Sequence, residues 1–330
     1  MNLRRYLLRK AAYVVLTSLL ITTLNFFLIQ VLPGDPTYAL LPRGGSGGFG
    51  TGSLRETIIH LWGLDQPLIV RYAIYLNNLL HGNLGYTIIY HPGTPIGDIL
   101  FPSLENTLVF VGTATFLTML LGLFLGRISG WKRGSKTDVA ITMGTLAGYS
   151  MPSFWVSLVL VYGLAYTVRI FPEGDLHTTG FANLDPVSQA FDEMYHLVLP
   201  IATFVITNVA WYSLTLRSSL TDVLPEDYMV TAAAKGLTEH QQLRHHAMPN
   251  ARPPFVTASA LYFGWVLSGV IVVEEVFNLN GLGTLTWNAT TSRDYPLLSA
   301  VFLVATLGVV VANAITDVLY TYLDPRIKEA

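Results

Sequence analysis

The chain has 330 residues, of which 52% are hydrophobic and only 12% are charged. Soluble domains carry about 25% charged residues, so this composition indicates a protein embedded in a lipid bilayer. The formal net charge of −2 argues against a generally basic nucleic-acid-binding protein, and the lack of cysteine excludes disulfides and thiolate metal sites within the chain.

The first apolar run is Ala11–Leu32, which carries no charge and follows four basic residues within the first ten positions. A basic start before an apolar run is also the pattern of a secretory signal peptide. This run is longer than the apolar part of a signal peptide, and no A-x-A cleavage site follows it. We therefore expect residues 1–32 to hold the N-terminus and a retained first transmembrane helix.

A 73-residue insert, residues 33–105, separates this run from the next one. The insert opens with PGDP and contains the glycine-rich piece RGGSGGFGTGS, which is typical of a flexible surface loop. Two short helices are expected after it, around Leu54–Trp62 and Gln66–Leu80.

Five further uncharged runs follow in residues 106–330, and about 20 apolar residues suffice to cross a bilayer. These runs are Asn106–Gly126, Val139–Val168, Met194–Leu216, Pro253–Val273 and Tyr295–Thr316. The 30 residues of Val139–Val168 are too many for one straight span. Pro152 is expected to kink this helix or to divide it into two segments, because proline removes a helix hydrogen bond. We expect six spans in total. A seventh would place the C-terminus on the opposite side.

The distribution of lysine and arginine predicts the orientation, because cytoplasmic loops carry an excess of both. With the N-terminus inside and six spans, fourteen of the nineteen basic residues are cytoplasmic, including all the lysines. The protein is then predicted to lie in the cell membrane with both termini cytoplasmic. Residues 33–105 are predicted to be extracytoplasmic, and residues 217–252 to form a cytoplasmic loop.

This loop, residues 217–252, reads as two short helices. Pro225-Glu226-Asp227 is a plausible helix start, and the following residues are rich in alanine, a strong helix former. Gly236 fits a left-handed cap, and Thr238 with Gln241 forms a capping-box pattern that restarts a helix. That helix is expected to end at Asn250 and Pro253-Pro254. A small-residue face at Thr231, Ala232 and Ala234 would admit a partner surface, although an interfacial helix under the bilayer is the alternative.

Several chemistries have no support in the sequence. It contains no G-x-x-x-x-G-K-[ST] phosphate loop and no H-E-x-x-H motif, and the G-x-S-x-G spacing within its glycine-rich loop is not a nucleophile elbow, so an intramembrane enzyme is disfavoured. The histidines at 240, 245 and 246 have poor spacing for a metal site. The middles of the predicted spans lack charges, which disfavours a proton-coupled carrier. Energy for transport would then enter through a partner.

Motifs along the whole chain resemble those of one family, the membrane permease subunit of ABC importers of the dipeptide/oligopeptide/nickel type. They are, in order, PGDP, GLDQPLIVRYAIYLNNLLHGNLGYT, SMPSFW, LTLRSSLTDVLPEDYMVTAAAKGL, VVEEVFNLNGLGTL, RDYPLL and LDPRIKE. The resemblance implies an all-α polytopic fold of the type I ABC importer permease, with a five-helix core in residues 106–330. It identifies the chain as the first permease of a pair.

The same resemblance implies partners and a coupling site. The partners are a second homologous permease, two ATP-binding subunits and an extracytoplasmic substrate-binding protein; this chain would bind neither ATP, Mg nor any other cofactor. A cytoplasmic EAA-type helix would dock the ATPase. The EAA motif of the wider family has an acidic residue at the position that Val230 occupies here. The chain does contain the DY…AKGL pattern that is found in the peptide-transporting branch of the family. The residues assigned to coupling are Asp227, Tyr228, Thr231, Ala232, Lys235, Gly236 and Leu237.

Polar and aromatic residues inside the predicted spans are candidates to line the pore, with interhelical packing as the alternative for each. They are Pro152, Asn208, Trp211, Tyr212 and Ser268. Glu274-Glu275 follows the fifth span and is expected to be a solvated anchor, or else a contact for a cationic substrate or the binding protein. The substrate is expected to be a di- or oligopeptide, with oligosaccharides second. A stand-alone secondary carrier or channel is the competing function.

Overall fold

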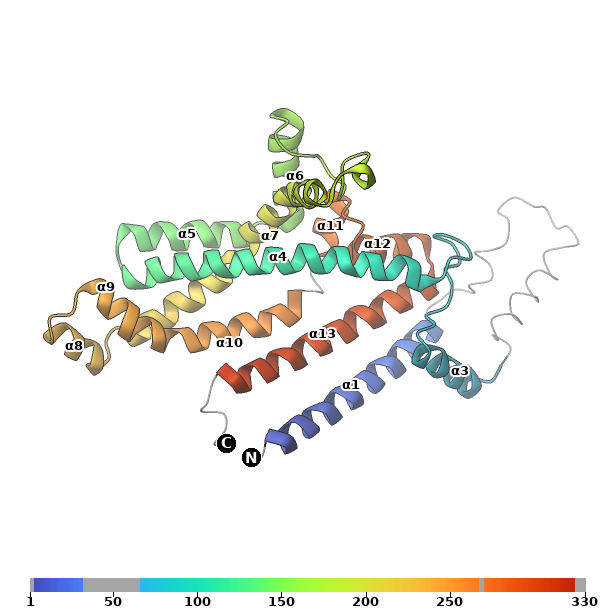
Figure 1. Ribbon diagram of the computed structural model, residues 1–330, viewed down its shortest axis with the longest axis horizontal. Helices are drawn as coiled ribbons and strands as arrows, with labels where there is room; N and C mark the ends of the chain where they lie inside the picture. The colour runs from blue at the N-terminus through green and yellow to red at the C-terminus, as the bar shows by residue number, and fades with distance from the viewer. Residues whose placement is uncertain (1–2, 32–65, 267–269, 324–330) are drawn as a thin grey trace, which may run out of the picture.

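The computed structural model describes residues 3–31, 66–266 and 270–323, and these ranges are mainly helical (Figure 1). The helices before the loop are α1 (Leu3–Val31), α3 (Leu68–Leu80), α4 (Ile96–Trp131), α5 (Lys136–Ser150), α6 (Ser153–Leu160) and α7 (Pro186–Val223). The others are α8 (Asp227–Ala234), α9 (Glu239–Gln242), α10 (Met248–Val266), α11 (Ile271–Phe277), α12 (Leu282–Ser292) and α13 (Tyr295–Leu323). The expected all-α class is confirmed for the described residues.

The long helices α4, α7 and α10 form a bundle, with α8 and α9 at one end of it (Figure 1). We call this the loop end, and it lies on the left in Figure 1. Helices α11 and α12 and the start of α4 lie toward the opposite end, and α1 runs antiparallel along α13. Helix α1 begins, and α13 ends, on the side of the molecule that faces the loop end.

Within the described residues, four helical segments are long and apolar enough to cross a membrane: Leu8–Phe27, Ile96–Trp131, Pro186–Val223 and Tyr295–Ile315. A fifth is possible if the bent pair Lys136–Ser150 and Ser153–Thr167 counts as one span. The expected span Pro253–Val273 includes residues 267–269, which lie outside the described residues. A multi-pass membrane protein is therefore supported, while the count of six stays a prediction.

The third expected span is broken at Pro152, as one of the two predicted alternatives required. Helix α5 ends at Ser150, and Pro152 directly precedes the first residue of α6. The two segments meet at 99°. The extended backbone of Met151 and Pro152 separates them, because proline cannot continue the hydrogen bonding of α5.

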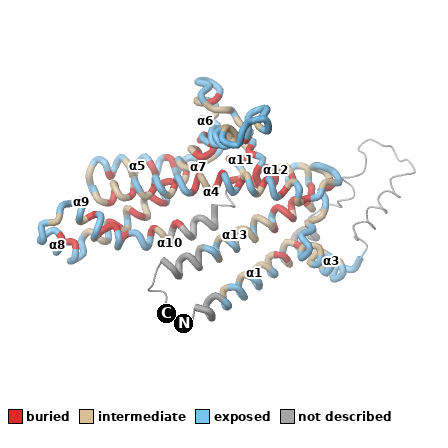
Figure 2. Tube along the Cα trace, in the orientation of Figure 1, coloured by how far each residue is buried: buried red, intermediate tan, exposed pale blue. Residues whose placement is uncertain are grey.

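Buried residues occur along the length of the bundle (Figure 2), and the buried apolar side chains of the described residues form three clusters. One lies near the opposite end and includes Ile96, Leu100 and Leu297. A middle cluster contains Phe110, which packs edge to face against Phe204 with 6.4 Å between the ring centroids. The third joins α7 to α8 and α10 at the loop end. Packed apolar side chains thus lie at both ends of the bundle and in its middle.

The insert before α4 differs in part from its expected boundary. Helix α3 confirms the predicted helix near Gln66–Leu80, whereas the one around Leu54–Trp62 lies outside the described residues. Helix α4 already begins at Ile96, so the last residues of the expected insert 33–105 belong to the bundle. Buried Asp294 holds the preceding turn in place, because one carboxylate oxygen accepts the backbone N–H groups of residues 88, 89 and 90 at 2.8 to 3.1 Å.

Candidate coupling site

Helix α8 is anchored to the bundle by one narrow face. Met229 and Ala232 are buried, and Met229 belongs to the cluster that contains Leu216 of α7 and Met248 of α10. Burial of Ala232 corrects the expected small-residue face, because this side chain packs inward while Thr231 and Ala234 are exposed. The sequence alone could not show which of the small residues faces the core, because that depends on how α8 packs against the bundle. Ala232 thus packs against the bundle and does not belong to the surface that a partner could reach.

The other face of α8 is open. Val230 is 64% exposed and Tyr228 is 38% exposed, and Asp227, Thr231 and Lys235 are also exposed. Partial desolvation, reinforced by the charge of Glu226, raises the pKa of the Tyr228 hydroxyl above its usual value.

Gly236 ends α8 in the left-handed conformation, with φ of 76°, as predicted. Its N–H donates to the carbonyl of Ala233 at 2.9 Å, and the N–H of Leu237 reaches back to Ala232. These two bonds form a Schellman cap, which favours glycine because other residues are strained at positive φ. A Cβ added at Gly236 would meet no atom within 4 Å, so the backbone angle alone explains glycine here.

Thr238 restarts the helix with the predicted capping box. The N–H of Gln241 donates to the Thr238 hydroxyl, and the Thr238 N–H donates to the Gln241 side-chain oxygen at 2.9 Å. The hinge between two helical pieces at Gly236-Leu237 is therefore confirmed.

The predicted end of the second piece at Asn250 and Pro253-Pro254 is wrong. Helix α9 continues through a π-helical turn, Leu243–Ala247, directly into α10, which contains both prolines. Prolines are tolerated in membrane helices where neighbouring groups satisfy the freed carbonyls. One turn before the proline pair, Asn250 donates its side-chain amide to the carbonyl of His246 at 2.7 Å. The second helical piece of the loop is therefore continuous with α10.

Helices α4 and α7 approach closely along three glycines of α4, Gly122, Gly126 and Gly130. A Cβ on Gly126 would lie 2.5 Å from the carbonyl oxygen of Ser213, and one on Gly130 would lie 2.8 Å from Leu220 Cβ. The sequence carries this signal as G-x-x-x-G-x-x-x-G, a pattern of small residues that lets membrane helices pack at short range. The predictions made from the sequence do not include this glycine pattern.

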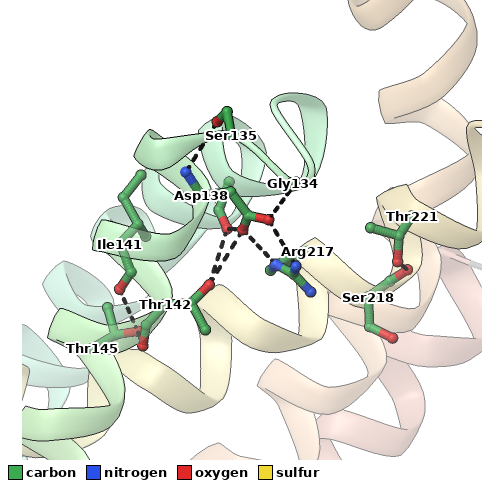
Figure 3. Close-up of polar contacts among 10 residues, drawn as sticks. Gly134, Ser135, Asp138, Ile141, Thr142, Thr145, Arg217, Ser218 and Thr221 are labelled. Atoms are coloured by element: carbon green, nitrogen blue, oxygen red, sulfur yellow. Dashed lines mark hydrogen bonds and ion pairs between the residues drawn. The ribbon is translucent and has the colours of Figure 1, made fainter.

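A buried ion pair ties the α4–α5 turn to α7 (Figure 3). Arg217 donates from Nε and Nη2 to the two carboxylate oxygens of Asp138, at 2.7 and 2.8 Å. The same carboxylate accepts bonds from the Ser129 hydroxyl and from the N–H of Gly134. Asp138 is 2% exposed, so the bidentate pair fixes the geometry from which α7 leads into the loop. The sequence shows both charges at span edges but not that they meet.

The pore candidates lie in different environments. Pro152 is exposed at the α5–α6 break, and Trp211 is 45% exposed. The amide of Asn208 donates to the carbonyl of Phe204 at 2.8 Å. Tyr212 is 1% exposed and packs against Phe255, which is the interhelical alternative for this residue. Ser268 lies outside the described residues.

Glu274 is not a solvated anchor, and that expectation is corrected. Its side chain is 1% exposed and accepts hydrogen bonds from the Thr107 hydroxyl and from the N–H of Gly283, both at 2.7 Å. These bonds hold α11 and the start of α12 against α4. The pattern of two adjacent glutamates after an apolar run gives no sign that one of them turns inward.

Comparison with known proteins places these features in a family. Residues 119–329 match the family described as the binding-protein-dependent transport system inner membrane component, and residues 3–96 match its N-terminal family. The oligopeptide transport system permease protein AppB of Bacillus subtilis (strain 168) is 33% identical over 98% of this chain and 99% of its own length. The di/tripeptide transport system permease protein DppB of Pseudomonas aeruginosa (strain UCBPP-PA14) is also 33% identical, over 98% of each chain.

The fold agrees with a solved transporter. An inward-facing structure of the MetNI methionine ABC transporter superposes with a TM-score of 0.53 at 15% identity, covering 68% of this chain and 96% of that one. This similarity concerns the fold alone. The two family matches and the two relatives show that the chain belongs to the inner-membrane permeases of binding-protein-dependent ABC importers, in the peptide-transport group.

Proposed function

We propose that this chain forms half of the translocation pore of an ATP-driven importer and that α8 docks an ATPase subunit. The observation that carries the proposal is the two-sided character of α8. Its open face presents Tyr228, Val230 and Lys235, while Met229 is locked into the cluster shared with α7 and α10. A displacement of α8 by a partner would therefore be transmitted to both long helices.

The coupling residues are proposed to have three different roles: contact with the ATPase, setting the angle between the helices, and packing against the bundle. Asp227, Tyr228, Thr231 and Lys235 would contact the ATPase, because all of them are exposed. Gly236 and Leu237 would set the angle between the two helical pieces through the Schellman cap. Ala232 would keep α8 seated on the bundle rather than touch the partner.

The proposed topology has six spans with both termini cytoplasmic, residues 33–105 extracytoplasmic and a five-helix core in residues 106–330. The excess of lysine and arginine on the cytoplasmic side supports it. The directions of α1 and α13 also support it, because α1 starts and α13 ends on the side of the loop end.

The proposed assembly contains a second homologous permease, two ATP-binding subunits that hold ATP and Mg, and an extracytoplasmic binding protein. The chain itself is proposed to carry no cofactor and to catalyse no reaction. Pro152, Asn208, Trp211 and Ser268 remain proposed pore residues. The substrate is proposed to be a di- or oligopeptide, because two relatives that match the whole chain are named as oligopeptide and di/tripeptide permeases; oligosaccharides come second.

A substitution on the open face of α8 tests the docking proposal. Val230→Asp adds a charge to an apolar position that is 64% exposed, so the permease should still fold but should no longer co-purify with its ATPase subunits. Val187→Asp is the matched control, because Val187 is 65% exposed and lies at the start of α7, away from the loop end. Both variants are compared with the wild-type chain for membrane content, ATPase co-purification and ATP-dependent peptide uptake.

The expected result is loss of co-purification and of uptake for Val230→Asp at normal membrane content, with wild-type ATPase co-purification for Val187→Asp. Full co-purification of Val230→Asp would refute docking through this face. Equal loss for both variants would show a general defect in assembly and would also count against it.

A further inference from the structure

We infer that a cavity beside the loop end binds the phosphate headgroup of an anionic phospholipid. The cavity measures about 310 Å³ and lies between α4 and the continuous segment formed by α9, the π-turn and α10. Its lining residues are Leu120, Leu123, Phe124, Arg127, His240, Arg244, Met248 and Arg252. None of them contributes to the open face of α8, so this site is separate from the proposed ATPase contact.

The cavity has a strongly cationic side. Arg127, Arg244 and Arg252 all line it, together with His240, and no acidic residue does. Among the described residues, none of the three arginines forms an ion pair. Three guanidinium groups in one small cavity repel one another, and an anion between them would relieve that repulsion. Guanidinium groups also match phosphate geometry with two parallel hydrogen bonds each.

The opposite side of the cavity is apolar and belongs largely to the membrane-spanning part of α4. Leu120 is 44% exposed and Phe124 is 58% exposed, and both occupy the same helix face as Arg127 because they precede it by seven and three residues. Arg127 directly follows the expected span Asn106–Gly126 and lies four residues before the end of α4 at Trp131, so its side chain is expected near the membrane surface. An acyl chain along Leu120 and Phe124 would thus place its phosphate next to Arg127.

The combination favours a lipid over a soluble anion. Free phosphate would use only the arginines and would leave the apolar wall in water, whereas a phospholipid covers both sides. Basic pockets at the ends of transmembrane helices are a recurring form of anionic-lipid site. A lipid bound here would bridge α4 to the helix that carries the loop. The inference requires only that the chain is a membrane protein, not that α8 docks an ATPase.

Native mass spectrometry of the full-length permease in detergent tests the site. We expect phosphatidylglycerol to bind more tightly than phosphatidylcholine with identical acyl chains. Arg127→Gln and Arg244→Gln should each weaken phosphatidylglycerol binding about fivefold, from about 1 kcal/mol per basic residue near an anionic surface. Arg133→Gln is the charge-matched control, because Arg133 is exposed on the α4–α5 turn and does not line the cavity. It should bind the lipid as the wild type does.

The apolar wall has its own control pair. Phe124→Gln should weaken lipid binding, while Phe116→Gln should not, because Phe116 is 56% exposed on the same helix but lies outside the cavity. Inorganic phosphate is the probe for a soluble-anion site and should displace the lipid only weakly. Thermal unfolding of each variant checks that it is folded.

Three results would overturn the inference. Equal affinity for phosphatidylglycerol and phosphatidylcholine would show that the arginines do not recognise an anionic headgroup. Full displacement of the lipid by inorganic phosphate would show that the cavity binds a soluble anion. If Arg244→Gln kept full lipid binding but lost ATPase co-purification, the arginines would serve a protein contact instead. Loss of ATPase binding by Val230→Asp alone leaves the lipid result unaffected, so the two proposals fail separately.

Discussion

At the scale of single residues, the Asp138–Arg217 pair connects the start of α5 to α7, the helix that leads into the loop. The carboxylate is buried and accepts hydrogen bonds from four groups: the Arg217 guanidinium, the Ser129 and Thr142 hydroxyls, and the N–H of Gly134. Removing one partner of a buried pair leaves the other charge uncompensated, which is more costly than the pair itself is stabilising.

We therefore expect Asp138→Asn to lower the free energy of unfolding by about 3 kcal/mol, near the lower limit for a buried pair because Arg217 keeps 29% of its side chain exposed. Unfolding in detergent, followed by circular dichroism, measures the change. Asp222→Asn is the control, because Asp222 is an exposed carboxylate on α7, the helix that carries Arg217. An effect no larger than that of the control would show that the pair does not stabilise the loop end.

At the scale of helices, the glycine seam of α4 determines how closely α7 can approach. Gly126→Ala should lower the free energy of unfolding by about 1 to 3 kcal/mol, the usual cost of overpacking, because the added Cβ would lie 2.5 Å from the Ser213 carbonyl oxygen. Gly112→Ala on the same helix should be neutral or slightly stabilising, since a Cβ there meets nothing within 4 Å. The two variants are compared by the same unfolding measurement, and equal effects would contradict the close packing.

The sequence predicted those helix features that depend on neighbouring residues. The start of α8 near Asp227, the left-handed cap at Gly236 and the capping box from Thr238 to Gln241 all follow from local backbone chemistry. So does the break at Pro152. Each of these can be predicted because cause and effect lie within a few positions of each other.

Features that depend on how helices pack could not be predicted in this way. The Asp138–Arg217 contact joins residues 79 positions apart, and the contact of Thr107 with Glu274 joins residues 167 positions apart. The inward turn of Ala232 and the continuation of α10 through Pro253 and Pro254 also depend on what each helix packs against. The arginine cavity arises only when α4 and α10 lie together.

At the scale of the whole molecule, the predicted topology can be tested directly because the chain contains no cysteine. In intact cells, a membrane-impermeant maleimide should label Thr179→Cys, in the exposed segment before α7, but not Arg133→Cys on the α4–α5 turn. Permeabilised cells should label both. A cysteine appended to the C-terminus should be protected, as six spans require. Labelling of Arg133→Cys or of the C-terminus in intact cells would contradict the topology.

The central claim is that this chain is a half-pore driven by ATP hydrolysis on partner subunits. The most direct measurement is uptake of a labelled oligopeptide by liposomes that contain either the purified chain alone or the complete assembly of both permeases, both ATPase subunits and the binding protein. We predict uptake only by the complete assembly and only with ATP and Mg. Uptake by the chain alone, driven by an ion or substrate gradient, would contradict the account and establish a stand-alone carrier or channel.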